Sequence, residues 1–367
     1  MIAPRHGCVP PVDEECSGPL PFILHCNRES NEAATAGLLD WLFVLALLDQ
    51  TISGRTDELN REFSSGHPFR HLIIDQFLDA EFCRQLMAEF PTFDPTYALN
   101  ERGETGRKAV VDDLERLGPA YARFDQMIRS PEFLALIGRI TGIPSLLYDP
   151  EYIGGGTHEN LDGQELDSHV DFNYHPRRQW HRRLNLIVFL NNEWEQDWGG
   201  CLELLPDPWT PEGARPAAVV VPIANRAVLF ETNEHSWHGF RRIRLPSDRA
   251  SLSRRSIAVY FYTEERPESE TEASHGTLYV HRQLGEHIRA GHTLQQGDVD
   301  EIRTLLARRD VHMKFLYERE LEFSSVISGI VKSPSFRLGR ALTWPARALW
   351  GRWSTCAPIA NWRKPEN

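Results

Sequence analysis

The sequence lacks a long hydrophobic run, a secretory signal and a pattern of paired cysteines. The apolar stretch at residues 38–48 has eleven residues and contains Asp40, whereas a membrane span needs about 20. The six cysteines are irregularly spaced and form no C-x-x-C pair, so neither a disulfide scaffold nor a zinc ribbon is predicted. We therefore expect a cytoplasmic protein in which residues 38–48 form a buried or docking helix.

The chain also lacks a net positive charge. Its 40 Lys and Arg against 52 Asp and Glu give a net charge of −12, so a nucleic-acid partner is not predicted. Residues 331–367 differ, with seven Lys or Arg, one acid and four tryptophans. This composition favours peripheral association with an inner membrane. The run at residues 337–347 resembles tails of bacterial cell-surface polysaccharide biosynthesis proteins, which implies a polysaccharide-assembly partner. A solvated tail, or one docked on the protein's own acidic surface, is an equal alternative.

Short β-rich runs separated by turn residues dominate from residue 145 to residue 263. No helical crossovers separate them, so an antiparallel sandwich or barrel is favoured over a parallel sheet. A strand at 69–77 and helices that start after Asp79 and Ser130 brace this sheet. We expect a mainly β fold with bracing helices and helical appendages at both ends. The predicted divisions are a helical or irregular N-terminal extension with a linker at 51–67 (1–66), the main domain (67–266), an acidic loop and long helix (267–330) and the basic tail (331–367).

The long helix is predicted at residues 298–330 from apolar positions that recur every three or four residues. Seven of nine positions on this seam are apolar. Such a seam requires a covering surface, and both the same chain and a second copy in a homodimer fit. The seam consists of Ile302, Leu306, Arg309, Met313, Leu316, Glu320, Phe323, Ile327 and Ile330.

Two histidines and one carboxylate within the β-rich part suggest a metal site. His169 and Asp171 are two residues apart, so on a strand both side chains point to the same side. His238 follows 67 residues after Asp171, as 238 − 171 = 67, and would come from a neighbouring strand. This is the ligand set of a mononuclear non-haem iron(II) site. His235, three residues before His238, is the competing candidate.

The strand at 254–262 adds a buried cation. Arg254 and Ser256 share one face by alternation, while Arg255 lies on the other face. An inward arginine is costly unless an anion meets it, and its guanidinium suits a carboxylate.

The order of these motifs resembles that of the iron(II)- and 2-oxoglutarate-dependent dioxygenases, most closely the prolyl-4-hydroxylase-like group. The shared motifs are His169-x-Asp171, residues 183–191 with Trp194 and Gly199-Gly200, the strand at 226–231, Trp237-His238-Gly239 and Arg254-x-Ser256. The resemblance covers about residues 69–263 and implies a double-stranded β-helix, or jelly roll.

The resemblance also implies cofactors and roles. His169, Asp171 and His238 would bind iron(II), and Arg254 would bind the distal carboxylate of 2-oxoglutarate. The implied reaction uses O2 to hydroxylate an unactivated C–H bond and releases succinate and CO2, with ascorbate as a candidate reductant. Several relatives carry a tyrosine where this chain has Phe189, so Ser256 or Tyr152 is expected to substitute for it.

Residues beside the iron pair are candidates for the substrate pocket or its lid. The alternatives are that Arg183 pairs with a surface acid and that Asn185 is a satisfied core amide. The substrate itself, whether a peptide or prolyl group, a glycan or another small molecule, is left open. A non-catalytic jelly-roll scaffold of a cell-surface polysaccharide assembly system is the competing hypothesis. The candidate substrate residues are Asn173, Tyr174, Trp180 and Arg183.

Overall fold

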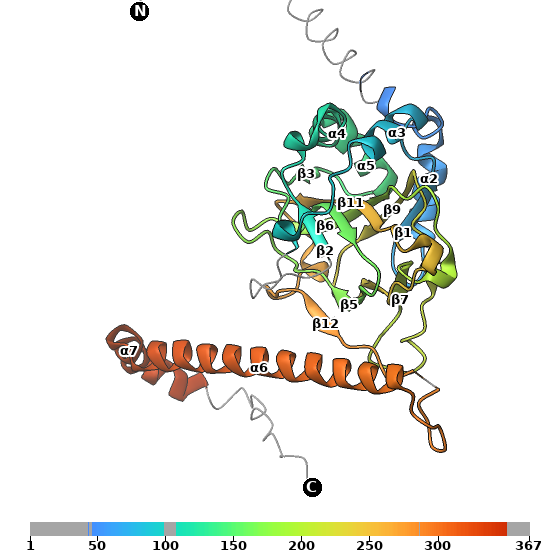
Figure 1. Cartoon of the computed structure of the whole chain (residues 1–367). Helices are drawn as coiled ribbons and strands as arrows, with labels where there is room; N and C mark the ends of the chain where they lie inside the picture. The colour runs from blue at the N-terminus through green and yellow to red at the C-terminus, as the bar shows by residue number, and fades with distance from the viewer. Residues whose placement is uncertain (1–42, 44–45, 99–107, 286, 351–367) are drawn as a thin grey trace, which may run out of the picture.

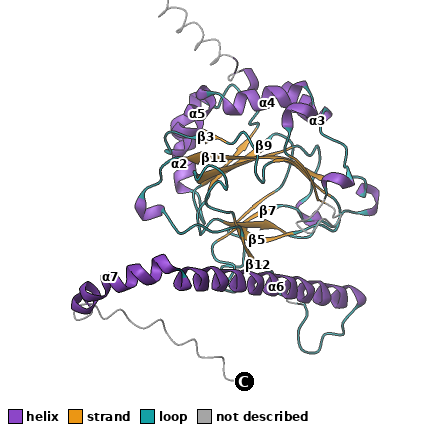
Figure 2. Cartoon of the chain, turned by 90° about the vertical axis from the view of Figure 1, so that its left-hand side faces the viewer, coloured by secondary structure: helices purple, strands orange, loops and turns teal. Residues whose placement is uncertain are grey.

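The computed structural model describes residues 43, 46–98, 108–285 and 287–350, with backbone alone at 344–350. Two antiparallel sheets lie face to face, and helices cover the outer face of the larger sheet (Figures 1 and 2). This arrangement confirms the predicted jelly roll with bracing helices.

The larger sheet contains seven strands, six of them in one continuous order. Its central strand β6 lies between β9 and β11 and pairs with both in antiparallel register. The strands in spatial order are β1 (His71–Asp75), β9 (Arg226–Glu231), β6 (His181–Phe189), β11 (Arg254–Thr263), β4 (Gly156–Asn160) and β2 (Lys108–Val111), and β3 (Leu147–Tyr148) pairs with β11.

The smaller sheet has five strands and closes the other side of the sandwich (Figure 2). Its centre is β10, which pairs with β5 on one side and β7 on the other. The strands in spatial order are β12 (Leu278–Val280), β5 (Leu166–Val170), β10 (Trp237–Phe240), β7 (Leu202–Leu205) and β8 (Ala218–Val220).

Four helices form the layer above the larger sheet (Figure 1). The helix α5 starts as predicted, because Ser130 accepts a hydrogen bond from the Phe133 N–H at 3.2 Å, and it ends at Gly142 with a positive φ of 71°. These helices are α2 (Thr56–Ser65), α3 (Ala80–Ala88), α4 (Pro119–Arg129) and α5 (Pro131–Thr141). Single 3-10 turns lie at Ser53–Arg55, Pro95–Tyr97, Leu114–Leu117, Gln196–Trp198, Ser247–Arg249 and Glu268–Glu270.

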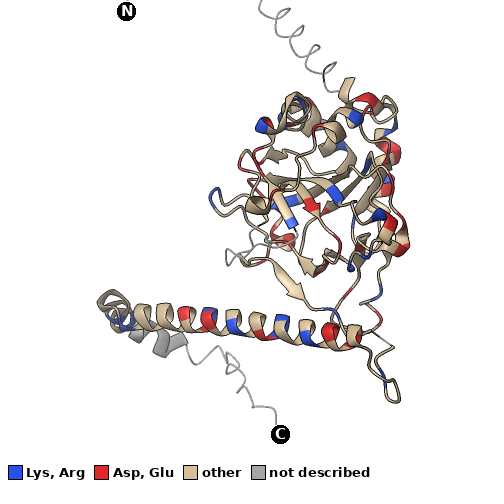
Figure 3. Cartoon of the chain, viewed as in Figure 1, with Lys and Arg blue, Asp and Glu red and all other residues tan. Residues whose placement is uncertain are grey.

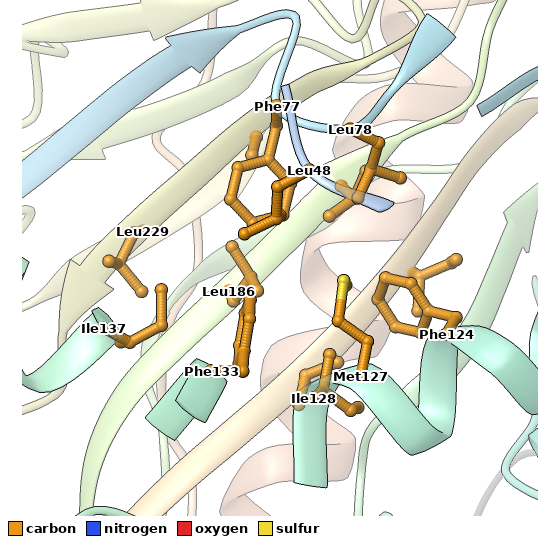
Figure 4. Close-up of a cluster of buried hydrophobic side chains, with 14 of the residues drawn as sticks. Leu48, Phe77, Leu78, Phe124, Met127, Ile128, Phe133, Ile137, Leu186 and Leu229 are labelled. Atoms are coloured by element: carbon orange, nitrogen blue, oxygen red, sulfur yellow. The ribbon is translucent and has the colours of Figure 1, made fainter. Parts of the chain in front are cut away.

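The main hydrophobic core lies between these helices and the larger sheet (Figure 4). Alternation along β6 sends Leu184, Leu186 and Val188 to this core. Phe189 and Ile187 point the other way, into the space between the two sheets. The helices therefore stabilise the sheet from outside and leave its inner face available for polar side chains.

The predicted linker at residues 51–67 is wrong. Most of it forms α2, whose Leu59 and Phe63 are buried in the main core. Within α2 these two are the only apolar residues, and tertiary packing rather than composition makes the segment a helix. The predicted helix at 38–48 lies largely outside the described residues, but Leu47 and Leu48 are buried and Leu48 pairs with Leu78.

The long helix is confirmed as α6 (Gln296–Lys332), and a second helix, α7 (Pro334–Trp350), follows it (Figure 1). The first half of α6 contacts the domain mainly through charged groups, including Arg308 with Glu165 at 2.8 Å and Glu301 with Arg282 at 2.7 Å. Residues 351–367 of the predicted tail lie outside the described part. No described helix is long and apolar enough to cross a membrane.

The apolar seam of α6 is exposed for most of its length. Leu316 is 51% exposed and Ile327 is 60% exposed, so packing against the described part of the same chain is excluded. Charges of both signs are interspersed along the helix (Figure 3).

Replacing Phe63 tests whether α2 belongs to the folded core. Phe63→Ala is expected to lower the free energy of unfolding by about 3 to 5 kcal/mol, because it removes a fully buried ring. Denaturant unfolding followed by circular dichroism measures the change. The exposed neighbour provides a control, since Glu62→Ala should change stability by less than about 0.5 kcal/mol. Equal stability of both variants would show that α2 is dispensable.

Candidate functional site

Two histidines meet across the paired strands β5 and β10. His238 lies directly opposite His169 in the ladder, and the ring centroids are 4.2 Å apart. Asp171 follows the last residue of β5. Its Oδ1 lies 3.8 Å from the His169 Nε2, and its Oδ2 lies 3.8 Å from the His238 Nε2. The structure thus brings the three predicted residues together, with all ligand atoms within 4.8 Å.

Backbone hydrogen bonds orient both imidazoles. The Nδ1 of His169 lies 3.0 Å from the Asp167 carbonyl, and the Nδ1 of His238 lies 2.9 Å from the Ser236 carbonyl. A carbonyl only accepts, so each Nδ1 carries the proton and each Nε2 presents a lone pair. Such a partner behind the imidazole is typical of metal-binding histidines.

Burial keeps the two imidazoles neutral. It lowers the pKa of His238, and together with repulsion from His238 it lowers the pKa of His169 to about 3. Burial alone would raise the pKa of Asp171, but Arg182 and the two histidines outweigh it and hold this pKa at about 2. Two neutral imidazoles and one carboxylate fit iron(II) and leave part of its coordination sphere open. The competing candidate His235 is exposed and lies outside this group.

Arg182 contacts Asp171 and is a residue that the sequence reasoning missed. Its Nη2 lies 3.0 Å from the Asp171 Oδ2, and its guanidinium stacks over the Tyr260 ring at 3.5 Å. Strict alternation along β6 would have put Arg183 inside instead. A bulge between Leu184 and Arg182 shifts the register and turns Arg182 inward.

Asn185 also reaches the site, where its Nδ2 donates to the Asp171 Oδ2 at 3.5 Å. Asn185 is therefore a buried amide that points into the space between the sheets, where it pairs with the carboxylate beside the two histidines.

Arg254 is buried on the inner face of β11, as alternation predicts. Its Nε donates to the Gly200 carbonyl at 2.6 Å, and its guanidinium lies over the rings of Phe240 and Phe189 at 4.5 and 5.1 Å. Burial lowers its pKa to about 10. Arg254 forms no ion pair with an acid in the described part of the chain, so it is a buried cation prepared for an external anion. Ser256 is buried two residues further along the same face.

Comparison with known proteins agrees with this geometry. Residues 156–284, from the start of β4 to just beyond β12, match the family model described as the 2OG-Fe(II) oxygenase superfamily. This part of the chain belongs to that superfamily. The match includes the three candidate metal ligands and Arg254. The predicted enzyme class, an iron(II)- and 2-oxoglutarate-dependent dioxygenase, is thereby confirmed, and so are iron(II) and 2-oxoglutarate as its cofactors.

Several solved structures are similar to the oxygenase domain. They include a prolyl hydroxylase from Trichoplax adhaerens in complex with a hypoxia inducible factor peptide fragment (18% identity, 59% of this chain and 92% of that chain covered, TM-score 0.41). HygX from Streptomyces hygroscopicus, with nickel and 2-oxoglutarate bound, is 16% identical (58% and 92% covered, TM-score 0.37). A Pseudomonas putida prolyl-4-hydroxylase is 15% identical (57% and 94% covered, TM-score 0.35). No curated protein matches the sequence significantly.

Tyr152 does not face the oxygenase site. Its hydroxyl donates to the Asp125 Oδ1 at 2.9 Å, and its ring belongs to the core under the helices. The positive φ of 46° at Tyr152 places it in a turn, where strand alternation does not apply. Its predicted contact with the cosubstrate therefore conflicts with its orientation.

The four candidate substrate residues lie near the start of β6, and internal contacts occupy the polar groups of Asn173, Tyr174 and Arg183. Asn173 donates to the Ala273 carbonyl at 2.9 Å, and the Tyr174 hydroxyl donates to the Glu272 carbonyl at 3.4 Å. Arg183 pairs with Glu270 at 3.2 Å, as its alternative interpretation expects. The Trp180 ring is partly exposed and packs beside the inner cluster.

A second histidine and carboxylate group lies at the start of α6. His287 and His292 contact Asp298 at 2.9 and 2.8 Å. Asp298 also accepts from the Gln295 N–H and caps the helix. The positive end of the helix dipole disfavours a cation there, so histidine–carboxylate pairing explains this group.

His158, whose Nε2 is buried, makes the stability of the oxygenase domain depend on pH. Burial, followed by Lys108 and Arg254, holds its pKa well below the usual value. The unfolded chain, with a histidine pKa of about 6.5, therefore binds more protons at lower pH. The free energy of unfolding should fall by about 1.4 kcal/mol per pH unit below about pH 6.5 from this residue alone. His158→Gln should reduce the measured slope of the free energy of unfolding against pH. His235→Gln, at an exposed position, should leave this slope unchanged.

Proposed function

We propose that the oxygenase domain hydroxylates an unactivated C–H bond of a peptide or prolyl group, a glycan or another small molecule. The reaction would convert 2-oxoglutarate and O2 into succinate and CO2. The observation that carries the proposal is one buried space in which two neutral imidazoles and a carboxylate lie on one sheet and the unpaired Arg254 lies on the other.

In this proposal His169, Asp171 and His238 hold the iron, and Arg254 holds the distal carboxylate of 2-oxoglutarate with Ser256 as a further donor. The bound iron and cosubstrate supply the oxidising chemistry. The protein fixes their orientation and excludes water.

Arg182 is a positioning residue in this proposal. It holds the Oδ2 of Asp171, and Asn185 contacts the same oxygen. Both contacts restrain the rotation of the carboxylate, so the Oδ1 stays on the side of His169. The ring of Tyr260 covers the guanidinium and keeps water from it.

Substrate selection would depend on the entrance near β6. Tyr174 and Trp180 are partly exposed, so their rings remain proposed substrate contacts. Asn173 and Arg183 are buried and hold neighbouring loop residues, and we propose that they shape the entrance indirectly. The competing scaffold function is disfavoured, because a scaffold has no use for a buried arginine without a carboxylate partner.

Loss of one imidazole should abolish cofactor binding and turnover. Anaerobic addition of iron(II) and 2-oxoglutarate to the wild type is expected to give a metal-to-ligand charge-transfer absorption, and oxygen should then yield succinate. His169→Ala should lose both signals, because two remaining ligands cannot hold the metal. His235→Ala is the matched control and should retain them. A charge-transfer band that persists in His169→Ala would contradict the assignment.

We also propose that the exposed seam of α6 is covered by a second copy of the chain. Exposed apolar side chains recur along the seam from Leu306 to Ile330, interrupted by Arg309 and Glu320, and an apolar stripe of this length is typical of helix pairing. Peripheral membrane association and a polysaccharide-assembly partner remain predictions for the tail.

A charge in the seam should separate the two copies. Leu316→Glu is expected to convert a dimer into a monomer in size-exclusion chromatography with light scattering, because it buries a carboxylate in an apolar contact. Ser325→Glu adds the same charge at an exposed position of α6 on the side opposite the seam and should leave the dimer intact. A monomeric wild type would refute the proposed dimer.

A further inference from the structure

Lys108 lies on the inner face of the larger sheet, in the same cross-strand row as Arg254. It pairs with Asn160 of β4, and Asn160 pairs on its other side with Arg254 of β11. Directly opposed residues of antiparallel strands point to the same face, so all three side chains enter the space between the sheets. Two strand spacings separate the backbones of Lys108 and Arg254 by roughly 10 Å, and both side chains are long enough to reach one ligand between them.

The charge of Lys108 interacts with Arg254 and with two histidine side chains. Burial first, and then Arg254, lowers the pKa of Lys108. The lysine in turn contributes to the lowered pKa values of His158 and of the candidate ligand His169. The ammonium is therefore close enough to interact electrostatically with both Arg254 and the candidate ligand His169.

No described group neutralises this lysine. Lys108 makes no hydrogen bond or ion pair with any residue that the structure describes. The carboxylate of Asp171 already contacts Arg182 at 3.0 Å. The Nε2 of His158 is also buried without a hydrogen-bond partner among the described residues. His158 pairs with Ser256 in the ladder, so its side chain lies on the same inner face as those of Lys108 and Arg254.

Among the residues that the structure describes, this arrangement has more positive charge than nearby carboxylates compensate. Three cations, Lys108, Arg182 and Arg254, lie on the inner face of the larger sheet, and the carboxylate of Asp171 lies on the opposite, smaller sheet. Unpaired buried charges are costly, so the site favours a ligand that brings negative charge. A dicarboxylate with one end at the metal and the other at Arg254 meets this requirement.

We propose that Lys108 is a second anchor for the distal carboxylate of 2-oxoglutarate, beside Arg254. This inference rests on the proposed function, and it assigns to an edge strand outside the family match a role in holding the cosubstrate. Lys108 also compensates for Phe189, which lies opposite Ser256 in the ladder and has no hydroxyl to donate to the cosubstrate.

The test is the affinity for 2-oxoglutarate, measured anaerobically in the iron(II)-loaded full chain by the charge-transfer absorption. Lys108→Met should raise the Kd roughly tenfold to a hundredfold, since it removes a charged hydrogen bond. Lys108→Arg should recover most of the affinity. Lys314→Met, at an exposed position of α6, is the matched control and should bind as the wild type does. Unfolding midpoints of all variants verify that they fold.

A second ligand locates the contact. With 2-oxopentanoate, which lacks the distal carboxylate, Lys108→Met and the wild type should bind equally. Weakening by the same factor for both ligands would place the lysine at the other carboxylate and overturn the assignment. Unchanged 2-oxoglutarate affinity in a folded Lys108→Met would also overturn it. A wild type that binds no 2-oxoglutarate at all would instead refute the proposed function, and this inference with it.

Discussion

The direct pairing of His238 with His169 is the contact on which the rest of the site depends. The two residues are 69 positions apart in the chain, as 238 − 169 = 69, and only the antiparallel ladder between β5 and β10 brings them together. Once they face each other, Asp171 needs only to follow β5 to complete the group. The hydrogen bonds from each Nδ1 to a backbone carbonyl then fix the rings without any further side chain.

The two faces of the larger sheet differ in polarity. Its outer face packs against α2, α3, α4 and α5 and buries a large apolar cluster. Its inner face contains arginines, a lysine and a histidine, which weaken the domain when they are buried without partners. The apolar contacts between the helices and the outer face offset this loss of stability. The helices therefore make a polar site possible although they do not contact it.

The sequence was informative where regular alternation holds and less so where it breaks. His169, Asp171, His238 and Arg254 follow strand geometry and a known order of motifs, and all were predicted. Arg182 was missed because a bulge in β6 exchanges it with Arg183. Lys108 was missed because β2 has only four residues and follows no apolar run.

Two features outside the sheets were also predicted wrongly from the sequence. The helix α2 was taken for a linker because its two buried residues are the only apolar signal in a polar segment. Tyr152 was expected near the cosubstrate as a substitute for the hydroxyl missing at Phe189, yet the turn before β4 directs its ring into the helix layer. Neither orientation follows from composition or periodicity.

The strand β5 supports two parts of the molecule at once. Its Asp167 accepts the His169 Nδ1–H through its carbonyl, and through its carboxylate it contacts His281 at 2.9 Å and Arg308 of α6 at 3.6 Å. His281 in turn lies 3.2 Å from His312 of the same helix. The helix α6 and the candidate metal ligand His169 therefore both depend on contacts made by Asp167. A partner that pulls α6 away from the domain has to break contacts made by the residue that holds His169 in place.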